Sequence, residues 1–170
     1  MEVKMSKSMR VAVLTLSDSG YEGKREDRSG VVIRELMEEA GYTVIDSKIL
    51  PDGIEPLAEE LKTLCDADLA DLILTTGGTG FSSRDLTPEA TLSVVERQAP
   101  GIAEAMRWHS LQITSRAMLS RATAGIRKGT LIVNLPGSPK AVRECLEYIL
   151  PSLKHGLEIL KGTASECARP

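Results

Sequence analysis

Two acidic residues in this sequence have the type and setting needed to handle phosphate and a divalent cation. Asp52 stands in a Pro-Asp-Gly turn, and Asp85 follows Arg84 shortly after a glycine-rich run. Two carboxylates at neighbouring strand ends can hold Mg²⁺, which takes few protein carboxylates and completes its shell with phosphate oxygens. Each acid also has a plainer interpretation, Asp52 as a turn residue and Asp85 as an acid at a helix entry. The pair predicts a catalytic site in which Asp52 and Asp85 bind the metal.

The glycine-rich run is Thr76-Gly77-Gly78-Thr79-Gly80. Three glycines in four positions allow positive φ angles and present unhindered N–H groups to an anion, most often phosphate. No Gly-Lys-Ser/Thr follows, so this is not a Walker loop, and the third glycine of the dinucleotide fingerprint is missing. The segment predicts a phosphate-binding turn, with a tight turn that binds nothing as the alternative.

A second turn of this kind is Asn134-Leu135-Pro136-Gly137-Ser138-Pro139-Lys140, which leads into a helix. The helix N-terminus favours negative charge, and the Ser138 hydroxyl is placed to cap it. A capping loop without a ligand is the alternative. Two such turns at one sheet edge suit a nucleotide triphosphate, and neither contains a lysine like that of the Walker motif. Further positive charge could come from Arg84, Arg116, Arg121 and Lys140.

Strands and helices alternate along the chain and bring these segments together. The patterns predict strands over 10–16, 43–50, 69–75, 122–127 and 130–135. They predict helices over 29–40, 87–98 and 139–161, a helix that starts at Pro56, and one that follows the break at Pro100-Gly101 and ends at about Leu111. Residues 17–28 are expected to form a loop, Thr87 to cap its helix, and Pro151 to restart the last one. The result is an α/β fold, a three-layer α/β/α arrangement with a mostly parallel, mixed sheet.

Four of the expected strands end in small, polar or acidic residues, with Ser17 and Asp18 following the first. In open α/β sheets ligands bind in the crevice beyond the carboxyl ends of the strands. We therefore expect Asp52, Asp85 and both glycine turns to share one solvent-accessible cleft.

Length and composition limit the possible functions. The 170 residues fit one domain, with a core over about 10–162 and irregular ends at 1–9 and 163–170. The net charge of −3 and five aromatic residues argue against a nucleic-acid partner. No apolar run is long enough for a membrane helix, and no secretion signal is visible. Three widely spaced cysteines favour a reducing cytoplasm over a disulfide framework.

Taken together, several of these segments closely resemble the MogA/MoaB family of molybdenum-cofactor biosynthesis. The similarity runs from about residue 10 to 162. The segments that carry it are Ser17-Asp18, Leu50-Pro-Asp52, Thr75–Gly80, Arg84–Thr91, Ala117–Arg121, Ala124–Arg127 and Asn134–Lys140.

The resemblance implies an activity and a set of site residues. The MogA branch transfers AMP from Mg-ATP to the phosphate of molybdopterin and releases pyrophosphate. By resemblance, Asp52 and Asp85 match the family's essential acids, and 76–80 matches its nucleotide-binding turn. The pocket shared by nucleotide and pterin would be formed by Ser17, Asp18, Ser120 and the turn Asn134, Pro136, Gly137 and Ser138.

The resemblance also implies partners and leaves alternatives open. The family assembles as trimers or hexamers, and a downstream metal-insertion protein is a further expected partner. Molybdenum and tungsten pathways are not distinguished, nor is the half of the ligand that each pocket residue touches. The alternative function is a non-catalytic, MoaB-like pterin-binding protein, and a generic nucleotide phosphohydrolase is a third.

Overall fold

The structure is a computed structural model, and it describes residues 7–164. The irregular ends expected at 1–9 and 163–170 lie largely outside the described residues. Strands and helices follow one another along the chain in this order: β1 (Arg10–Leu16), α1 (Asp18–Tyr21), α2 (Arg28–Glu39), β2 (Thr43–Leu50), α3 (Glu55–Asp66), β3 (Leu72–Thr76), α4 (Thr87–Val94), β4 (Arg97–Gln98), α5 (Pro100–Leu111), the 3₁₀-helix η1 (Ser115–Leu119), β5 (Ala124–Arg127), β6 (Thr130–Leu135) and α6 (Pro139–Leu160).

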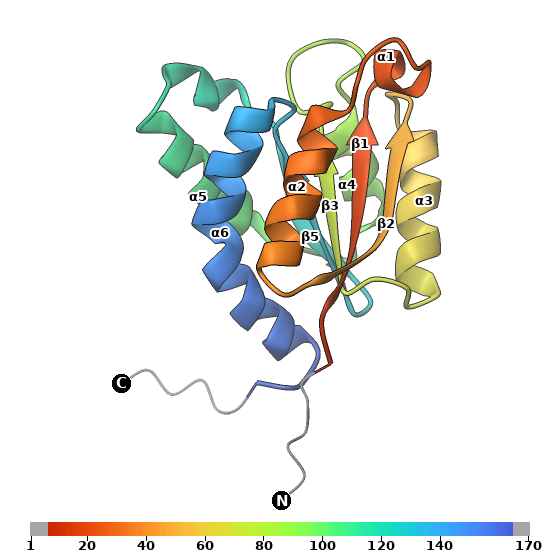
Figure 1. The fold of residues 1–170 in the computed structure, drawn as a ribbon, viewed down its shortest axis with the longest axis vertical. Helices are drawn as coiled ribbons and strands as arrows, with labels where there is room; N and C mark the ends of the chain where they lie inside the picture. Colours follow the sequence, from red (N-terminus) through yellow and green to blue (C-terminus); the bar gives the residue numbers. More distant parts are fainter. Residues whose placement is uncertain (1–6, 165–170) are drawn as a thin grey trace, which may run out of the picture.

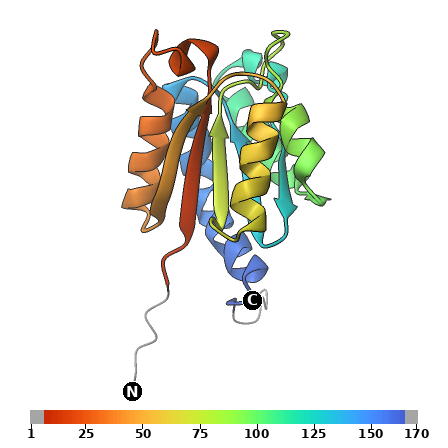
Figure 2. The same cartoon turned by 90° about the vertical axis from the view of Figure 1, so that its right-hand side faces the viewer.

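A six-stranded sheet in the order β2-β1-β3-β6-β5-β4 forms the middle layer. Strands β2, β1, β3 and β6 are parallel, while β5 runs antiparallel to both β6 and β4. Helices α2, α5 and α6 cover one face, and α3 and α4 cover the other (Figures 1 and 2). The predicted three-layer fold with a mixed, mostly parallel sheet is confirmed.

The central strands are buried on both faces, which explains their continuous apolar runs. Val11 and Val13 of β1 point into the core beneath α2 and α6, whereas Ala12 and Leu14 point into the core beneath α3 and α4. Because successive side chains of a strand alternate between faces, one strand supplies both cores.

Several predicted boundaries were wrong. Residues 17–28 are not all loop, because Ser17 accepts from the Gly20 N–H and begins the short helix α1. The helix expected over 87–98 ends at Val94, and Arg97–Gln98 joins the sheet as its edge strand. Helix α6 runs without interruption through Pro151. In that helix the buried stripe on both sides of the proline outweighs one lost hydrogen bond.

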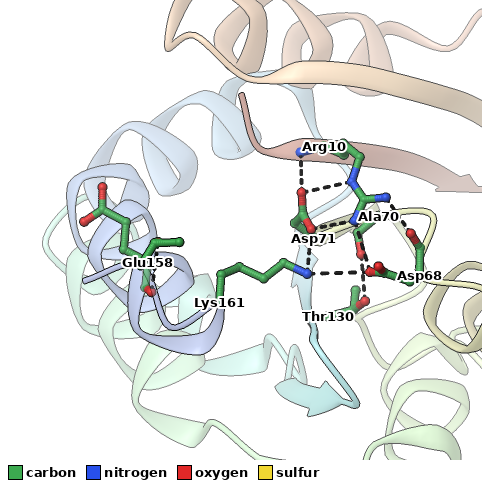
Figure 3. Close-up of polar contacts among 8 residues, drawn as sticks. Arg10, Asp68, Ala70, Asp71, Thr130, Glu158 and Lys161 are labelled. Carbon is green, nitrogen blue, oxygen red and sulfur yellow. Dashed lines mark hydrogen bonds and ion pairs between the residues drawn. The ribbon is translucent and has the colours of Figure 1, made fainter. Parts of the chain in front are cut away.

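An ionic cluster joins the last helix to the end of the sheet opposite the strands' carboxyl ends (Figure 3). Asp71 receives hydrogen bonds from the Arg10 backbone N–H (2.8 Å) and guanidinium (2.8 Å to Nη2), and Lys161 Nζ lies 2.7 Å from it. Asp71 is buried, and Asp68 lies against the same two cations from the solvent side. The cluster anchors the end of α6 to the residues that open β1 and β3.

Candidate functional site

The predicted site residues gather at the carboxyl edge of the parallel strands, at the upper end of the molecule in Figure 1. The chain leaves β1 toward α2 on one face, whereas α3, which leads into β3, lies on the other face. The boundary between β1 and β3 is therefore the position at which such sheets bind ligands. A hollow of about 620 Å³ opens there, lined among others by Ser17, Thr76, Gly77, Gly137 and Ser138.

Asp18 and Asp52 are joined by two reciprocal hydrogen bonds, each from the backbone N–H of one residue to the carboxylate of the other. The Asp18 N–H donates to Asp52 Oδ2 (3.0 Å), and the Asp52 N–H donates to Asp18 Oδ1 (3.0 Å). Arg84 donates to both carboxylate oxygens of Asp18 (3.0 Å each) and to the Asp52 carbonyl (2.6 Å). The Arg84 guanidinium lowers the pKa of Asp18. The Asp18 carboxylate thus pairs with Arg84 and also accepts the hydrogen bond that positions the Asp52 backbone.

Asp52 and Asp85 both lie beside the glycine turn, at Gly78 and Gly80 respectively. A side chain added at Gly78 would reach within 3.6 Å of Asp52 Oδ1, and one added at Gly80 would come within 2.9 Å of Asp85 Oδ2. Burial raises the pKa of Asp52, and the negative charges of Asp18 and Asp85 raise it further. Asp52 therefore lies in the electric field of Asp85. The glycines at 78 and 80 leave the space beside these two carboxylates open, because a side chain at either position would fill it.

The two glycine-containing turns, at residues 76–80 and 134–138, also touch each other. Thr76 Oγ1 donates to the Pro136 carbonyl (2.6 Å), and a side chain at Gly137 would lie 3.4 Å from the Gly77 Cα. Gly77 and Gly78 have φ of +91° and +67°, the left-handed region that glycine adopts readily.

Thr87 does not cap α4 as predicted. Its hydroxyl donates instead to the Gly77 carbonyl (2.9 Å), and its N–H donates to the Gly78 carbonyl (3.1 Å). The start of α4 therefore fixes the glycine turn, because the long-range bond satisfies the hydroxyl that a local cap would have used.

A second hollow, of about 300 Å³, lies on the other side of the turns, between α5, η1 and the start of α6. Thr79, Gly80, Ser120 and Pro136 line it, together with apolar residues such as Met106. Both turns thus border two hollows and form a ridge between them, with Gly77 and Gly137 on one side and Gly80 and Pro136 on the other. Asp18, Asp52 and Asp85 line neither hollow, although the two catalytic acids were expected to share a cleft with the turns. This arrangement suits two ligand groups that meet at the ridge.

The prediction that the Asn134 side chain binds a ligand was wrong. Its side chain is completely buried, and Nδ2 donates to Thr75 Oγ1 (3.0 Å) and Thr91 Oγ1 (2.9 Å) while Oδ1 accepts from the Thr123 N–H (3.2 Å). An amide with its hydrogen bonds made inside the core has nothing to offer a ligand. It holds β6, β3 and α4 in register beneath the turn.

Sequence reasoning missed the wall of the first hollow that the start of α2 forms. Asp27 caps this helix by accepting from the Gly30 N–H (2.9 Å), and it also accepts from Thr15 Oγ1 (2.8 Å). Asp27, Ser29 and Thr15 line the hollow. The Asp-Arg-Ser-Gly run before an apolar helical pattern was an available signal for a helix start at this position.

The donor set fits a shared magnesium ion better than an all-protein metal cage. Among residues 7–164 no group of three or more histidine, cysteine, aspartate or glutamate side chains is arranged to hold a metal. Asp52 and Asp85 supply hard oxygen donors beside a turn suited to phosphate. Mg²⁺ is bound in this way, by one or two carboxylates plus phosphate oxygens and water.

Comparison with known proteins shows the family of this chain. Residues 12–155 match the family described as "Probable molybdopterin binding domain". The chain belongs to the MogA/MoaB family. The Helicobacter pylori J99 molybdopterin adenylyltransferase is 40% identical over 157 residues, 91% of this chain and 89% of that protein. The Escherichia coli K12 molybdopterin adenylyltransferase is 39% identical over 175 residues, 95% of this chain and 90% of that protein.

Solved structures of the MogA/MoaB family share the fold. The molybdopterin biosynthesis enzyme MoaB from Thermus thermophilus superposes with a TM-score of 0.86 at 45% identity, covering 91% of this chain and 97% of that one. The Mog protein of Mycobacterium ulcerans superposes with a TM-score of 0.85 at 36% identity, covering 92% and 99%. No helix among residues 7–164 has the length and apolar character needed to cross a membrane.

Proposed function

We propose that this protein is a molybdopterin adenylyltransferase, which transfers AMP from Mg-ATP to the terminal phosphate of molybdopterin. The observation that carries the proposal is the closeness of Asp52 to Gly78 and of Asp85 to Gly80, in a turn whose Gly77 and Gly80 line two neighbouring hollows. Relatives named for this activity cover nearly the whole chain at 37–40% identity.

The proposed reaction forms one bond and breaks one. A phosphate oxygen of molybdopterin attacks the α-phosphorus of ATP, and the bond from that phosphorus to the pyrophosphate oxygen breaks. A phosphate monoester is already largely ionised at neutral pH, since its second pKa is about 6, so no strong general base is needed. The chain's own task is to align the two phosphates and stabilise the charge that develops.

Each part of the site has a role in this proposal. The N–H groups of residues 76–80 and 136–138 bind phosphate oxygens, and Asp52 and Asp85 hold Mg²⁺ against them. When bound, the magnesium ion neutralises phosphate charge. Positive charge from Arg84 is not available for this purpose, because Asp18 already pairs with it. The proposal assigns Ser17 and Ser120 to substrate binding, one in each hollow.

The test is a pyrophosphate-release assay with purified protein, molybdopterin, ATP and Mg²⁺. We expect release that depends on all three and that Asp85→Asn abolishes in a folded protein. Asp66→Asn is the matched control, because this acid pairs with Arg127 away from the turns and should leave turnover unchanged. Absence of pyrophosphate from folded wild-type protein would refute the proposal.

The alternative is a non-catalytic pterin-binding protein, favoured by the 45% identity to the Thermus MoaB structure. It predicts tight pterin binding without ATP consumption. Calorimetric titration with ATP, with and without Mg²⁺, separates the two, because only the enzyme requires magnesium-dependent affinity. ATP hydrolysis in the absence of pterin would instead indicate a phosphohydrolase.

We further propose that the protein works in the cytoplasm as a homo-oligomer, with a trimer expected and a hexamer as the alternative, and that it passes its product to a metal-insertion protein. Free thiols at Cys65 and Cys145 agree with a reducing compartment. A group of exposed apolar side chains on α5, on η1, on the turn between them and on α6 suits contact between copies: Trp108, Leu111, Ile113, Met118, Leu119 and Tyr148. Light scattering would give the copy number.

A further inference from the structure

Arg121 donates three hydrogen bonds to backbone carbonyls of the glycine turn and of the loop after it. Its backbone N–H donates to the Thr79 carbonyl (2.8 Å), and its Nε donates to the Gly80 carbonyl (2.8 Å). Its Nη2 donates to the Asp85 carbonyl. One residue from the segment after η1 therefore binds the backbone on both sides of the loop 80–85.

The charge of Arg121 is neutralised within the protein. Nη1 forms an ion pair with Glu89 Oε1, in the first turn of α4, and Nη2 lies 3.4 Å from Oε2. The Glu89 carboxylate raises the pKa of Arg121, and Arg121 in turn lowers the pKa of Glu89, so both groups stay charged at neutral pH. A guanidinium oriented by a carboxylate and two carbonyls is not directed at a phosphate.

We infer that the Arg121–Glu89 pair is a positioning device that sets the glycine turn and Asp85 for catalysis, and that Arg121 does not bind phosphate itself. The inference rests on the proposed adenylyl transfer for its kinetic readout. Its physical basis is the planar guanidinium, whose donors lie in a fixed fork and can reach Gly80, Asp85 and Glu89 together. A lysine at the same position would carry the charge but could not make these three contacts at once.

The first test is charge-conserving. Arg121→Lys should lower kcat for AMP transfer by about 10- to 100-fold, the scale expected when reacting groups are misplaced by about 1 Å, with a much smaller change in KM for ATP. Arg127→Lys is the matched control, because Arg127 makes a similar set of contacts, to Asp66 and the Val94 carbonyl, in the hairpin strand β5. Activity in Arg121→Lys equal to that of this control would overturn the inference.

Glu89→Gln separates positioning from direct phosphate binding by the sign of its effect. If the pair positions the loop, this variant lowers kcat in the same direction as Arg121→Lys, and the double variant is no worse than the more affected single variant. If Arg121 binds phosphate, loss of Glu89 frees a cation and ATP binds more tightly in calorimetry. Tighter binding would contradict the inference, even if Arg121→Lys fails to fold.

Amide hydrogen exchange gives a readout that does not depend on the reaction. Peptides covering 79–86 should exchange about tenfold faster in Arg121→Lys or Glu89→Gln than in wild type, and at the wild-type rate in Arg127→Lys. Unchanged exchange in both pair variants would overturn the positioning role. If the three variants show this exchange pattern but the wild-type protein releases no pyrophosphate, the proposed activity is refuted and the positioning role stands.

Discussion

The ionic cluster around Asp71 provides a stability prediction that can be worked out from individual contacts. Asp71→Asn keeps one acceptor oxygen but removes the charge that faces Arg10 and Lys161 (Figure 3). Removing one partner of a buried ion pair costs about 3–5 kcal/mol, because the remaining charge is left uncompensated. Both cations are partly exposed and keep Asp68, so we expect the low end, about 3 kcal/mol.

The loss should depend on pH in a defined direction. Burial alone would raise the pKa of Asp71, but the hydrogen bonds from Arg10 and Lys161 outweigh it and hold this pKa well below its usual range. The folded protein therefore binds this proton more weakly than the unfolded chain does. The stabilisation is complete above the ordinary aspartate pKa of about 4 and is lost as the pH falls toward the lower folded value.

Urea unfolding of wild type and Asp71→Asn at pH 7 and pH 3 is the assay. At pH 7 the variant should lose about 3 kcal/mol, which corresponds to a melting temperature roughly 6–12 °C lower. The difference between the two proteins should be smaller at pH 3. Asp66→Asn is the control, with a smaller loss because that carboxylate is solvent-exposed. A difference below about 1 kcal/mol at pH 7, or one that grows on acidification, would refute the reasoning.

Three further outcomes are expected. Asp52→Asn should stabilise the ligand-free protein by about 0.5–1 kcal/mol at pH 7 while abolishing turnover, because burial raises the pKa of this carboxyl and its ionised form is unfavourable there; a lower melting temperature would count against it. Gly77→Ala should cost more than about 2 kcal/mol in urea unfolding, because its Cβ would lie 2.5 Å from the Leu16 carbonyl, whereas Gly41→Ala, with open space around it, should cost about 1 kcal/mol; equal losses would contradict the contact. Pro151→Ala should raise the unfolding free energy by about 1–2 kcal/mol, since it restores a donor inside α6; no gain in urea unfolding would argue against this.

Local chemistry in the sequence was sufficient to predict most of the fold. The apolar run Arg10–Leu16 and the Leu57–Leu61–Leu64 spacing predicted a buried strand and a helix that the structure confirms. Gly41, with φ of +86°, ends α2 as predicted. Boundaries failed where a distant contact replaced a local one, as at Thr87, whose hydroxyl bonds to Gly77 instead of capping its own helix.

The sequence by itself determined which residue types stand at the strand ends, because turn and cap chemistry depends on near neighbours. Only the tertiary structure decided what their side chains face. It buried Asn134 in the core and joined Asp18 to Asp52 across 34 residues. It also paired Arg121 with Glu89 beneath the glycine turn. Such pairings depend on how the parallel strands and the helices that connect them pack together. Neighbouring residues in the sequence do not determine which two loops lie side by side in the folded protein.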